Sequence, residues 1–205
     1  NILLICTDHL RADFLSINGH PLVQSPQIDQ IGLSGINFTR AFSECPVCCP
    51  ARRCLMTGMD SYGVNMHYNR DTQPFPEGPK LAAGKLHVWP PRNRIGFEEV
   101  MLNEEGRTAG LDLPDDYMQF LADEGLAHLA HSHGMGNNQY GCRLSPVPEP
   151  ATSTGWTADQ AMRFLRRRDP QRPFFLYVSF DKPPPPITPP GEYYELYRHA
   201  QFPAP

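Results

Sequence analysis

A short stretch that combines cysteine, proline and arginine is the part of the sequence best equipped for chemistry. Cys48 is followed by Pro50 and Arg52, and Gly58 comes further on. Proline in a first turn and glycine just past a last turn favour a helix, so we expect one from Pro50 to Met56. The unpaired N–H groups and the positive dipole at its start attract anions, and the Arg52 guanidinium can point toward the same anion. The pattern predicts a nucleophile at Cys48 facing an oxyanion such as sulfate.

Two other interpretations of these cysteines stay open. Cys45 and Cys48 have the spacing of metal ligands, and the same residues could equally be thiols buried under a helix. A closed zinc site takes four ligands, and the sequence has no second Cys-x-x-Cys pair. His131 and His133 are the compact candidates that remain. Both alternatives are therefore less favoured than the nucleophile.

Buried strands should carry these residues to one edge of a sheet. Residues 2–6 form a continuous apolar run, which predicts a buried central strand that ends at Thr7, Asp8 and His9. A second apolar run over residues 174–180 ends at Asp181. Groups placed after the carboxyl ends of strands are where an α/β sheet binds its ligands. We therefore expect Asp8 to lie close to Cys48.

Helices should separate these strands. Pro26 and Gly35 mark the start and end of a helix over residues 26–33, and Thr157 with Gln160 matches a capping box that opens another through residue 167. Strands that alternate with helices predict an α/β fold. The sequence further predicts a helix over 113–126, a strand over 36–42, and loops over 62–79, 146–150 and 183–190.

Composition narrows the class of protein. The 18 basic and 22 acidic side chains of the 205 residues give a net charge of −4, which does not favour nucleic acid or an anionic membrane as a partner. The longest apolar run, residues 2–6, is far shorter than the ~20 residues of a membrane span. Six cysteines are too few for a disulfide scaffold. No basic and apolar leader opens the sequence, which slightly favours a cytoplasmic location.

Several segments together resemble one enzyme family. The run from Pro46 to Gly58 is similar to the signature of type I, formylglycine-dependent sulfatases: Cys-x-Pro-x-Arg, an apolar pair and Thr-Gly. The opening from Thr7 to Asp13 resembles a Thr-Asp-Gln-x-Arg-x-Asp run of bacterial sulfatases, and Gly84-Lys85-Leu86-His87 resembles their Gly-Lys-x-His element. The resemblance implies a central mixed, mostly parallel sheet flanked by helices, of the alkaline phosphatase/sulfatase type. Residues 1–205 would be the N-terminal part of a single catalytic domain.

The resemblance also implies roles for individual residues. Cys48 would be oxidised by a maturation enzyme to formylglycine, whose hydrate attacks the sulfur of a sulfated small molecule or carbohydrate. Ca²⁺ or Mg²⁺ would be held by Asp8, His9 and the modified Cys48. Arg52 and Lys85 would balance the charge of the sulfate, and His87 would orient the hydrate or move a proton. Lys85 and His87, two apart on a strand, would project to one face.

The chain also departs from the family pattern. Pro184 stands where the family has a substrate-contacting histidine, a helix and a strand before Lys85 are missing, and the chain ends before the second pair of metal ligands. Two alternatives follow: a phosphonate or phosphate ester hydrolase of the same superfamily, or an inactive truncated relic that acts as a binding or structural domain. The last group of candidates could contact a sugar or form a solvated loop: Asn137, Asn138, Gln139 and Arg143.

Overall fold

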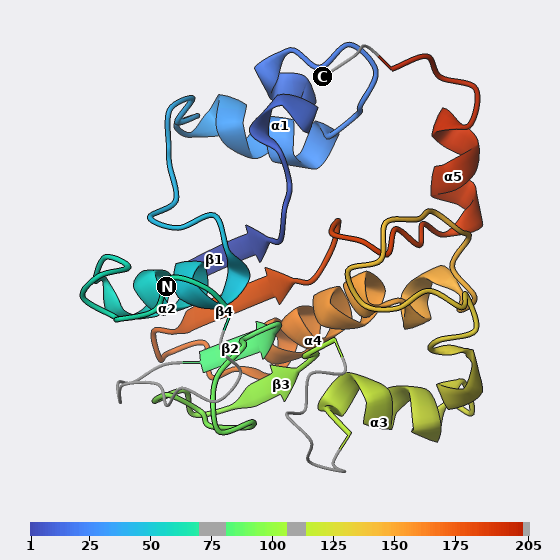
Figure 1. The fold of residues 1–205 in the computed structure, drawn as a ribbon. Helices are drawn as coiled ribbons and strands as arrows, with labels where there is room; N and C mark the ends of the chain where they lie inside the picture. The colour runs from blue at the N-terminus through green and yellow to red at the C-terminus, as the bar shows by residue number, and fades with distance from the viewer. Residues whose placement is uncertain (70–80, 106–113, 203–205) are drawn as a thin grey trace.

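A parallel four-stranded sheet forms the centre of the computed structural model, which describes residues 1–69, 81–105 and 114–202. The strand order is β1 (Ile2–Thr7), β4 (Phe175–Phe180), β2 (Leu81–Gly84) and β3 (Val100–Leu102), and every pair is parallel. Figure 1 shows the strands running in one direction, so that their carboxyl ends share one edge. The predicted α/β class and the strand over 174–180 are confirmed.

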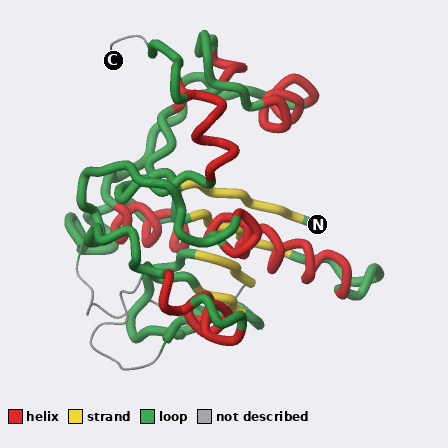
Figure 2. Tube along the Cα trace, turned by 90° about the vertical axis from the view of Figure 1, so that its right-hand side faces the viewer, coloured by secondary structure: helices red, strands yellow, loops and turns green. Residues whose placement is uncertain are grey.

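Helices cover both faces of β4, because its side chains alternate between them. Leu176 and Val178 are buried with Ala161 of α4 (Ser153–Arg167). Tyr177 points to the opposite face, where it packs in a cluster with Met56 of α2 (Cys48–Thr57). The sheet is therefore the middle layer between α2 and α4, as the strands in the turned view of Figure 2 also indicate.

The remaining helices lie around this centre. α3 (Asp116–Asp123) contacts β3, and its N-cap Asp115 accepts a hydrogen bond from the Met118 N–H. α1 (Pro26–Ser34) and α5 (Gly191–Tyr197) lie away from the sheet (Figure 1), where the Tyr197 hydroxyl accepts from the Gln24 N–H at 3.1 Å. Short 3-10 helices lie at Ala12–Phe14, Ser16–Asn18, Ala127–Leu129 and Glu149–Ala151.

The predicted position of the first strand is wrong. β1 was expected to be central and buried, yet within the described residues it pairs only with β4, and Ile2, Leu3 and Ile5 are 47–60% exposed. An apolar run reports a preference for burial, but it does not specify which strands flank it. The strand itself, and the position of Asp8 just past its end, are as predicted.

Two further local predictions need correction. Residues 36–42 form no strand; Ile36, Phe38 and Phe42 are exposed, because the alternation finds no partner strand among the described residues. The capping box at Thr157 is also wrong. α4 begins at Ser153, one turn earlier, because the Thr152 side chain accepts the Gly155 N–H and caps the helix instead.

The helices predicted around Pro26 and Pro50 are confirmed with small shifts. α1 runs from Pro26 to Ser34, and α2 ends at Gly58, which adopts the left-handed conformation expected of a helix terminator. α2 starts two residues before Pro50. The helix predicted over 113–126 is shorter, and residue 113 lies outside the described part. The predicted loop is seen as turns over 62–69, and its remainder, 70–79, is not described.

Candidate active site

The start of α2 presents Cys48 as its first residue. Val47 is the N-cap and offers no side-chain cap, so another group must satisfy the first amides. Asn69 does this: its Oδ1 accepts the Cys49 N–H at 3.1 Å and the Cys48 thiol at 3.3 Å. Sequence reasoning missed Asn69, because it lies in a loop with no periodic pattern. The contact fixes the Cys48 side chain at the helix start.

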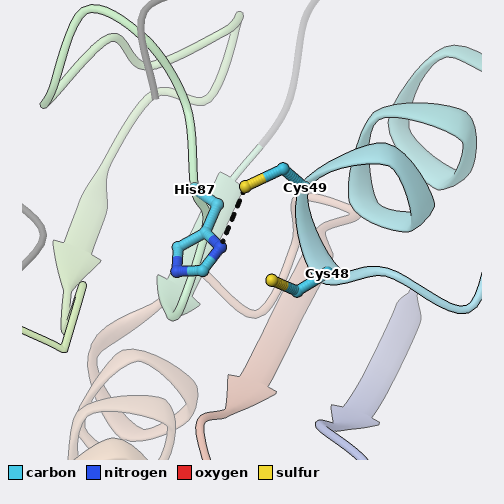
Figure 3. A group of neighbouring side chains, drawn as sticks. All are labelled: Cys48, Cys49 and His87. Atoms are coloured by element: carbon cyan, nitrogen blue, oxygen red, sulfur yellow. Dashed lines mark hydrogen bonds between the residues drawn. The ribbon is translucent and has the colours of Figure 1, made fainter. Parts of the chain in front are cut away.

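Cys48, Cys49 and His87 form a compact group at this helix end. Their sulfur and nitrogen atoms all lie within 4.8 Å of one another, and Cys49 Sγ is 3.4 Å from His87 Nδ1 (Figure 3). Cys45 and Cys48, the pair of the alternative zinc interpretation, are not brought together in this group. Three ligands are one short of a closed zinc site, so the described residues do not support the zinc interpretation.

Lys85 and His87 do not lie on a strand, contrary to the prediction. β2 ends at Gly84, and the two residues follow its carboxyl end. Gly84 has φ +97°, and a Cβ there would lie 2.1 Å from the Ser179 carbonyl oxygen. Only glycine permits this close approach, which lets the Lys85 N–H donate to that oxygen at 3.0 Å. The turn carries both side chains back toward α2.

A buried network of charges lies behind Cys48. The Lys85 ammonium bridges two carboxylates, with 2.5 Å to Asp8 Oδ2 and 2.8 Å to Glu105 Oε2. The Lys85 side chain is 3% exposed and that of Asp8 is 7% exposed. Opposite charges this close together attract each other more strongly where water is excluded. Burial lowers the pKa of Lys85, but the charges of Glu105 and Asp8 outweigh it and raise the pKa, so Lys85 is cationic.

Arg52 joins α2 to this network and to the sheet. Its Nη1 donates to the Lys85 carbonyl oxygen at 2.9 Å, the Tyr177 hydroxyl at 2.9 Å and Ser179 Oγ at 2.5 Å. Its Nη2 lies 3.4 Å from Asp8 Oδ2. Arg52 Nε is buried and has no hydrogen-bond partner among the described residues. Arg52 thus holds the scaffold through Nη1 and Nη2, and its Nε remains for another acceptor.

Two neighbouring acids complete the site, and sequence reasoning missed both. Glu104 accepts the backbone N–H groups of Leu86 at 2.8 Å and His87 at 2.9 Å, which fixes the loop after β2. Burial raises the pKa of Glu104. Glu105 lies 3.7 Å from His87 Nε2. The only sequence signal is their position after β3, and that strand is three residues long, too short for its periodicity to be recognised.

The electrostatics of the group favour negative charge at position 48. A hydrogen bond from Cys49 lowers the pKa of Cys48, with further lowering by His87 and by the charge of Lys85, against the opposing effect of burial. Burial lowers the pKa of His87, but the neighbouring Cys48, Glu105 and Glu104 outweigh it and raise the pKa. Cys49, His87 and Lys85 therefore favour an anionic group at the start of α2.

The described residues do not form a complete site for a hard divalent cation. Ca²⁺ and Mg²⁺ take six or more oxygen ligands. Asp8 offers one buried carboxylate, and its Oδ2 already accepts from Lys85 and Arg52. His9 is exposed and lies with Nε2 3.6 Å from Asp8 Oδ1. Among the described residues no carboxylate group of three or more gathers around Asp8. The donor set does not fit a cation by itself.

Comparison with known proteins decides the family. A family model described as Sulfatase matches residues 1–204. The chain belongs to the sulfatase family. This sulfatase-family chain is 31% identical over 229 residues to an arylsulfatase of Clostridium perfringens and 26% identical to the multifunctional alkaline phosphatase superfamily protein PehA of Trinickia caryophylli. All of the chain aligns with each, but it covers 47% and 46% of their lengths, so it spans about half of these relatives.

The fold agrees with this assignment. The crystal structure of a phosphonate monoester hydrolase of Agrobacterium radiobacter matches the whole sulfatase-family chain with a TM-score of 0.73 and 23% identity, over 45% of that protein. The chain therefore has the alkaline phosphatase/sulfatase-like fold, in part. Sulfatases as a family use a formylglycine and a divalent metal. None of the helices in the described part is long and apolar enough to cross a membrane.

Proposed function

We propose that residues 1–205 are the N-terminal part of one catalytic domain that hydrolyses sulfate monoesters of a small molecule or carbohydrate. The observation that carries the proposal is the position of Cys48. It lies at the start of α2, inside the family signature. Its thiol donates to Asn69 Oδ1 and lies beside His87. The helix start, His87 and Lys85 favour an anion at this position, and a sulfate ester is an anion.

The proposed nucleophile is a formylglycine made from Cys48 by a maturation enzyme. The side chain is partly accessible and its contacts accept a polar group, so an aldehyde or its hydrate fits the position. When present, that group supplies a hydroxyl for attack and a second hydroxyl whose deprotonation releases sulfate. An unmodified thiol lacks the second hydroxyl. Asn69 Oδ1 orients the substituent at position 48.

The neighbouring residues take separate roles in this proposal. His87 holds or transfers a proton at the ring nitrogen that faces Cys48 and Cys49, while Glu104 fixes its backbone. Lys85 supplies positive charge to the sulfate oxygens, and Arg52 does the same through Nε while its other donors anchor Asp8 and the sheet.

We propose Ca²⁺, or Mg²⁺, as the cation, with Asp8 as the ligand of this chain and His9 and the modified Cys48 beside it. Because the described residues do not complete such a site, no step above depends on the ion. The contribution of Asp8 can be measured without activity. In the intact protein, Asp8→Ala should lower the bound calcium found by elemental analysis, and Asp13→Ala, an exposed residue paired with Arg11, should not.

The decisive test examines position 48 directly. In the intact protein, produced together with a formylglycine-generating enzyme, the peptide that contains Cys48 should be about 18 mass units lighter, the difference between a thiol and an aldehyde side chain. Cys48→Ala should abolish hydrolysis of an aryl sulfate and Cys48→Ser should severely impair it. Cys142→Ala, a matched change at an exposed cysteine, should retain wild-type rates. An unmodified thiol would favour the alternative of an inactive, truncated relic. Wild-type rates in Cys48→Ala would refute the proposal.

A second activity is favoured by two of the similar proteins. The phosphonate monoester hydrolase and PehA belong to the same superfamily, and a tetrahedral phosphonate monoanion suits the same position at the start of α2. Rates for matched aryl sulfate and aryl phosphonate esters in the intact, matured protein separate the two. We expect a higher kcat/KM for the sulfate ester, and the reverse order would assign the phosphonate activity.

A further inference from the structure

A cavity of about 300 Å³ opens beside the candidate active site, at the same edge of the sheet. Two segments frame it: the connection between α3 and α4, and the chain that follows β4. They are hydrogen-bonded to each other, with the Arg143 N–H donating to the Ile187 carbonyl at 3.0 Å and the Ser145 N–H to Pro189 at 2.9 Å. Figure 1 shows these segments side by side beyond the carboxyl end of β4. The cavity has the size of a small-molecule site.

Two residues that line the cavity have buried polar atoms without a partner. Asn103 is 3% exposed and Asp181 is 4% exposed. Within the described residues, neither Asn103 Nδ2 nor Asp181 Oδ1 has a hydrogen-bond partner. A buried polar atom left unsatisfied is costly, and such atoms are uncommon in folded proteins. One is a donor and the other an acceptor, and a hydroxyl group can act toward either.

The other walls of the cavity suit a ring with an apolar face. Tyr117 lines it, and because its hydroxyl donates to the Ala151 carbonyl at 2.9 Å, the ring rather than the hydroxyl is available for contact. Its centroid lies 5.5 Å from that of Trp156, which holds the ring in place. Tyr193, from α5, lines the outer part and is 52% exposed. Aromatic walls with a few polar groups are typical of sites for small polar rings.

The charges around the cavity disfavour an anionic ring. Four carboxylates line it, against the single ammonium of Lys182 and two histidines. Lys182 is turned toward the chain itself, with Nζ 3.3 Å from the Pro186 carbonyl oxygen and 3.8 Å from Asp181 Oδ2. Burial lowers the pKa of His133, so that histidine is uncharged at neutral pH. The four carboxylates belong to Glu105, Asp115, Glu149 and Asp181.

Glu105 connects the cavity to the candidate active site. Its carboxylate lines the cavity and lies 2.8 Å from Lys85 Nζ and 3.7 Å from His87 Nε2. A ligand that fills the cavity would therefore reach the charged network around Cys48. Of the polar residues singled out in the sequence, Asn137 lines the cavity, whereas Arg143 Nη1 donates to the His133 carbonyl at 2.7 Å.

We propose that this cavity binds one uncharged, hydroxyl-bearing sugar ring, the part of the substrate that carries the sulfate ester or the unit next to it. A ring hydroxyl donates to Asp181 Oδ1 and accepts from Asn103 Nδ2, and the apolar face of the ring lies on Tyr117. The inference rests on the proposed sulfatase function for its biological meaning. Its binding step does not depend on that function and can be measured alone.

The binding test uses the intact protein and three sugars without sulfate. Saturation-transfer NMR with methyl β-galactoside, methyl β-N-acetylglucosaminide and methyl β-glucuronide reports binding of two uncharged rings and one anionic ring. We expect the uncharged ring that binds best to have a Kd at least fivefold lower than that of the glucuronide, because the carboxylates of the cavity repel an anionic ring. Asp181→Leu removes the acceptor and should weaken that binding about tenfold or more, the loss expected for a charged hydrogen bond.

Two further variants separate a specific loss from misfolding. Asp181→Asn keeps one acceptor oxygen and should restore part of the affinity lost in Asp181→Leu. Asp159→Asn changes an exposed residue of α4, paired with Arg163, and should bind as the wild type does. Binding that is equal in all variants, tighter binding of the glucuronide, or no binding of any sugar would overturn the inference.

Hydrolysis by the same proteins shows which proposal fails. The ratio of kcat/KM for a sugar monosulfate to that for 4-nitrophenyl sulfate should fall about tenfold in Asp181→Leu, because the nitrophenyl ring has no hydroxyl for Asp181. If the wild type binds the sugar but hydrolyses neither ester, the sulfatase proposal fails and the binding site stands. If it hydrolyses both and the ratio is unchanged in Asp181→Leu, the sulfatase proposal stands and the sugar site fails.

Discussion

Two groups of buried polar side chains lie along the same edge of the sheet and differ in how their charges are balanced. Around Lys85 the charges are matched: Asp8 and Glu105 lie on either side of one ammonium, and Arg52 reaches Asp8. In this group Arg52 Nε and His87 Nε2 are the buried atoms without a hydrogen-bond partner among the described residues. In the cavity, Asn103 and Asp181 each keep a buried atom without a partner among the described residues. Glu105 is common to both groups.

The difference indicates that the two groups of side chains have different roles. A network that is matched within the protein holds its shape before any substrate arrives, which is what electrostatic stabilisation of a reacting anion requires. Unmatched atoms in a cavity instead leave a donor and an acceptor for a ligand. The first group should therefore matter mainly for stability and reaction rate, and the second mainly for binding.

Removing the shared ammonium should have the largest effect on this comparison. Lys85→Met in the intact protein removes the ammonium beside Glu105 and leaves Asp8 with Arg52 alone, which should lower the free energy of unfolding by about 3–5 kcal/mol. Urea unfolding at pH 7 measures it. Arg163→Met is the control, because its ion pair with Asp159 is exposed and should contribute less than about 1 kcal/mol. Equal losses in the two variants would mean that the network around Lys85 is not matched as described.

Acid should weaken the matched network next, through Glu105. Burial raises its pKa, but the neighbouring His87 and the charge of Lys85 outweigh this and lower the pKa to about 2. A carboxylate with a lowered pKa contributes stability that is present above its unfolded pKa and is lost as pH falls through the folded value. Between about pH 4.5 and 2 the wild type should therefore lose about 2 kcal/mol more than Glu105→Gln.

Unfolding curves of both proteins across that pH range provide the measurement. Glu192→Gln, on the exposed side of α5, should follow the wild type throughout. A wild-type protein that loses no more stability than Glu105→Gln in acid would contradict the matched network.

The sequence predicts one of these groups much better than the other. Asp8, Arg52, Lys85 and His87 could be singled out because each lies in a short motif or just past an apolar run. Glu104, Glu105 and Asn69 could not, since they follow a three-residue strand or lie in an aperiodic loop. Their roles come from chain segments that meet only in the folded protein. The class of fold followed from alternating strands and helices, but the order of strands did not.

The cavity was still harder to anticipate. Asp181 was visible only as the residue after a predicted strand, and Asn103 has no local signal. Thr157 was placed at a helix start, yet it lies within α4 and is fully buried. Local patterns specify which residues prefer burial or a helix end. They do not specify which buried atoms remain without a partner, because that depends on every segment packed around them.

The smallest expected effect has the opposite sign and distinguishes the two groups most directly. Burial raises the pKa of Asp181, so ionising this carboxyl group costs more free energy in the folded chain than in the unfolded one. Without sugar, Asp181→Asn should therefore raise the free energy of unfolding by up to about 1 kcal/mol at pH 7, and the gain should vanish below the unfolded pKa of an aspartate, about 3.9. Urea unfolding at pH 7 and pH 3 measures both values. If the charge of Asp181 opposes folding and its replacement weakens sugar binding, the residue serves the ligand and not the fold. A loss of stability in Asp181→Asn would instead place Asp181 among the matched charges, and the contrast between the two groups would disappear.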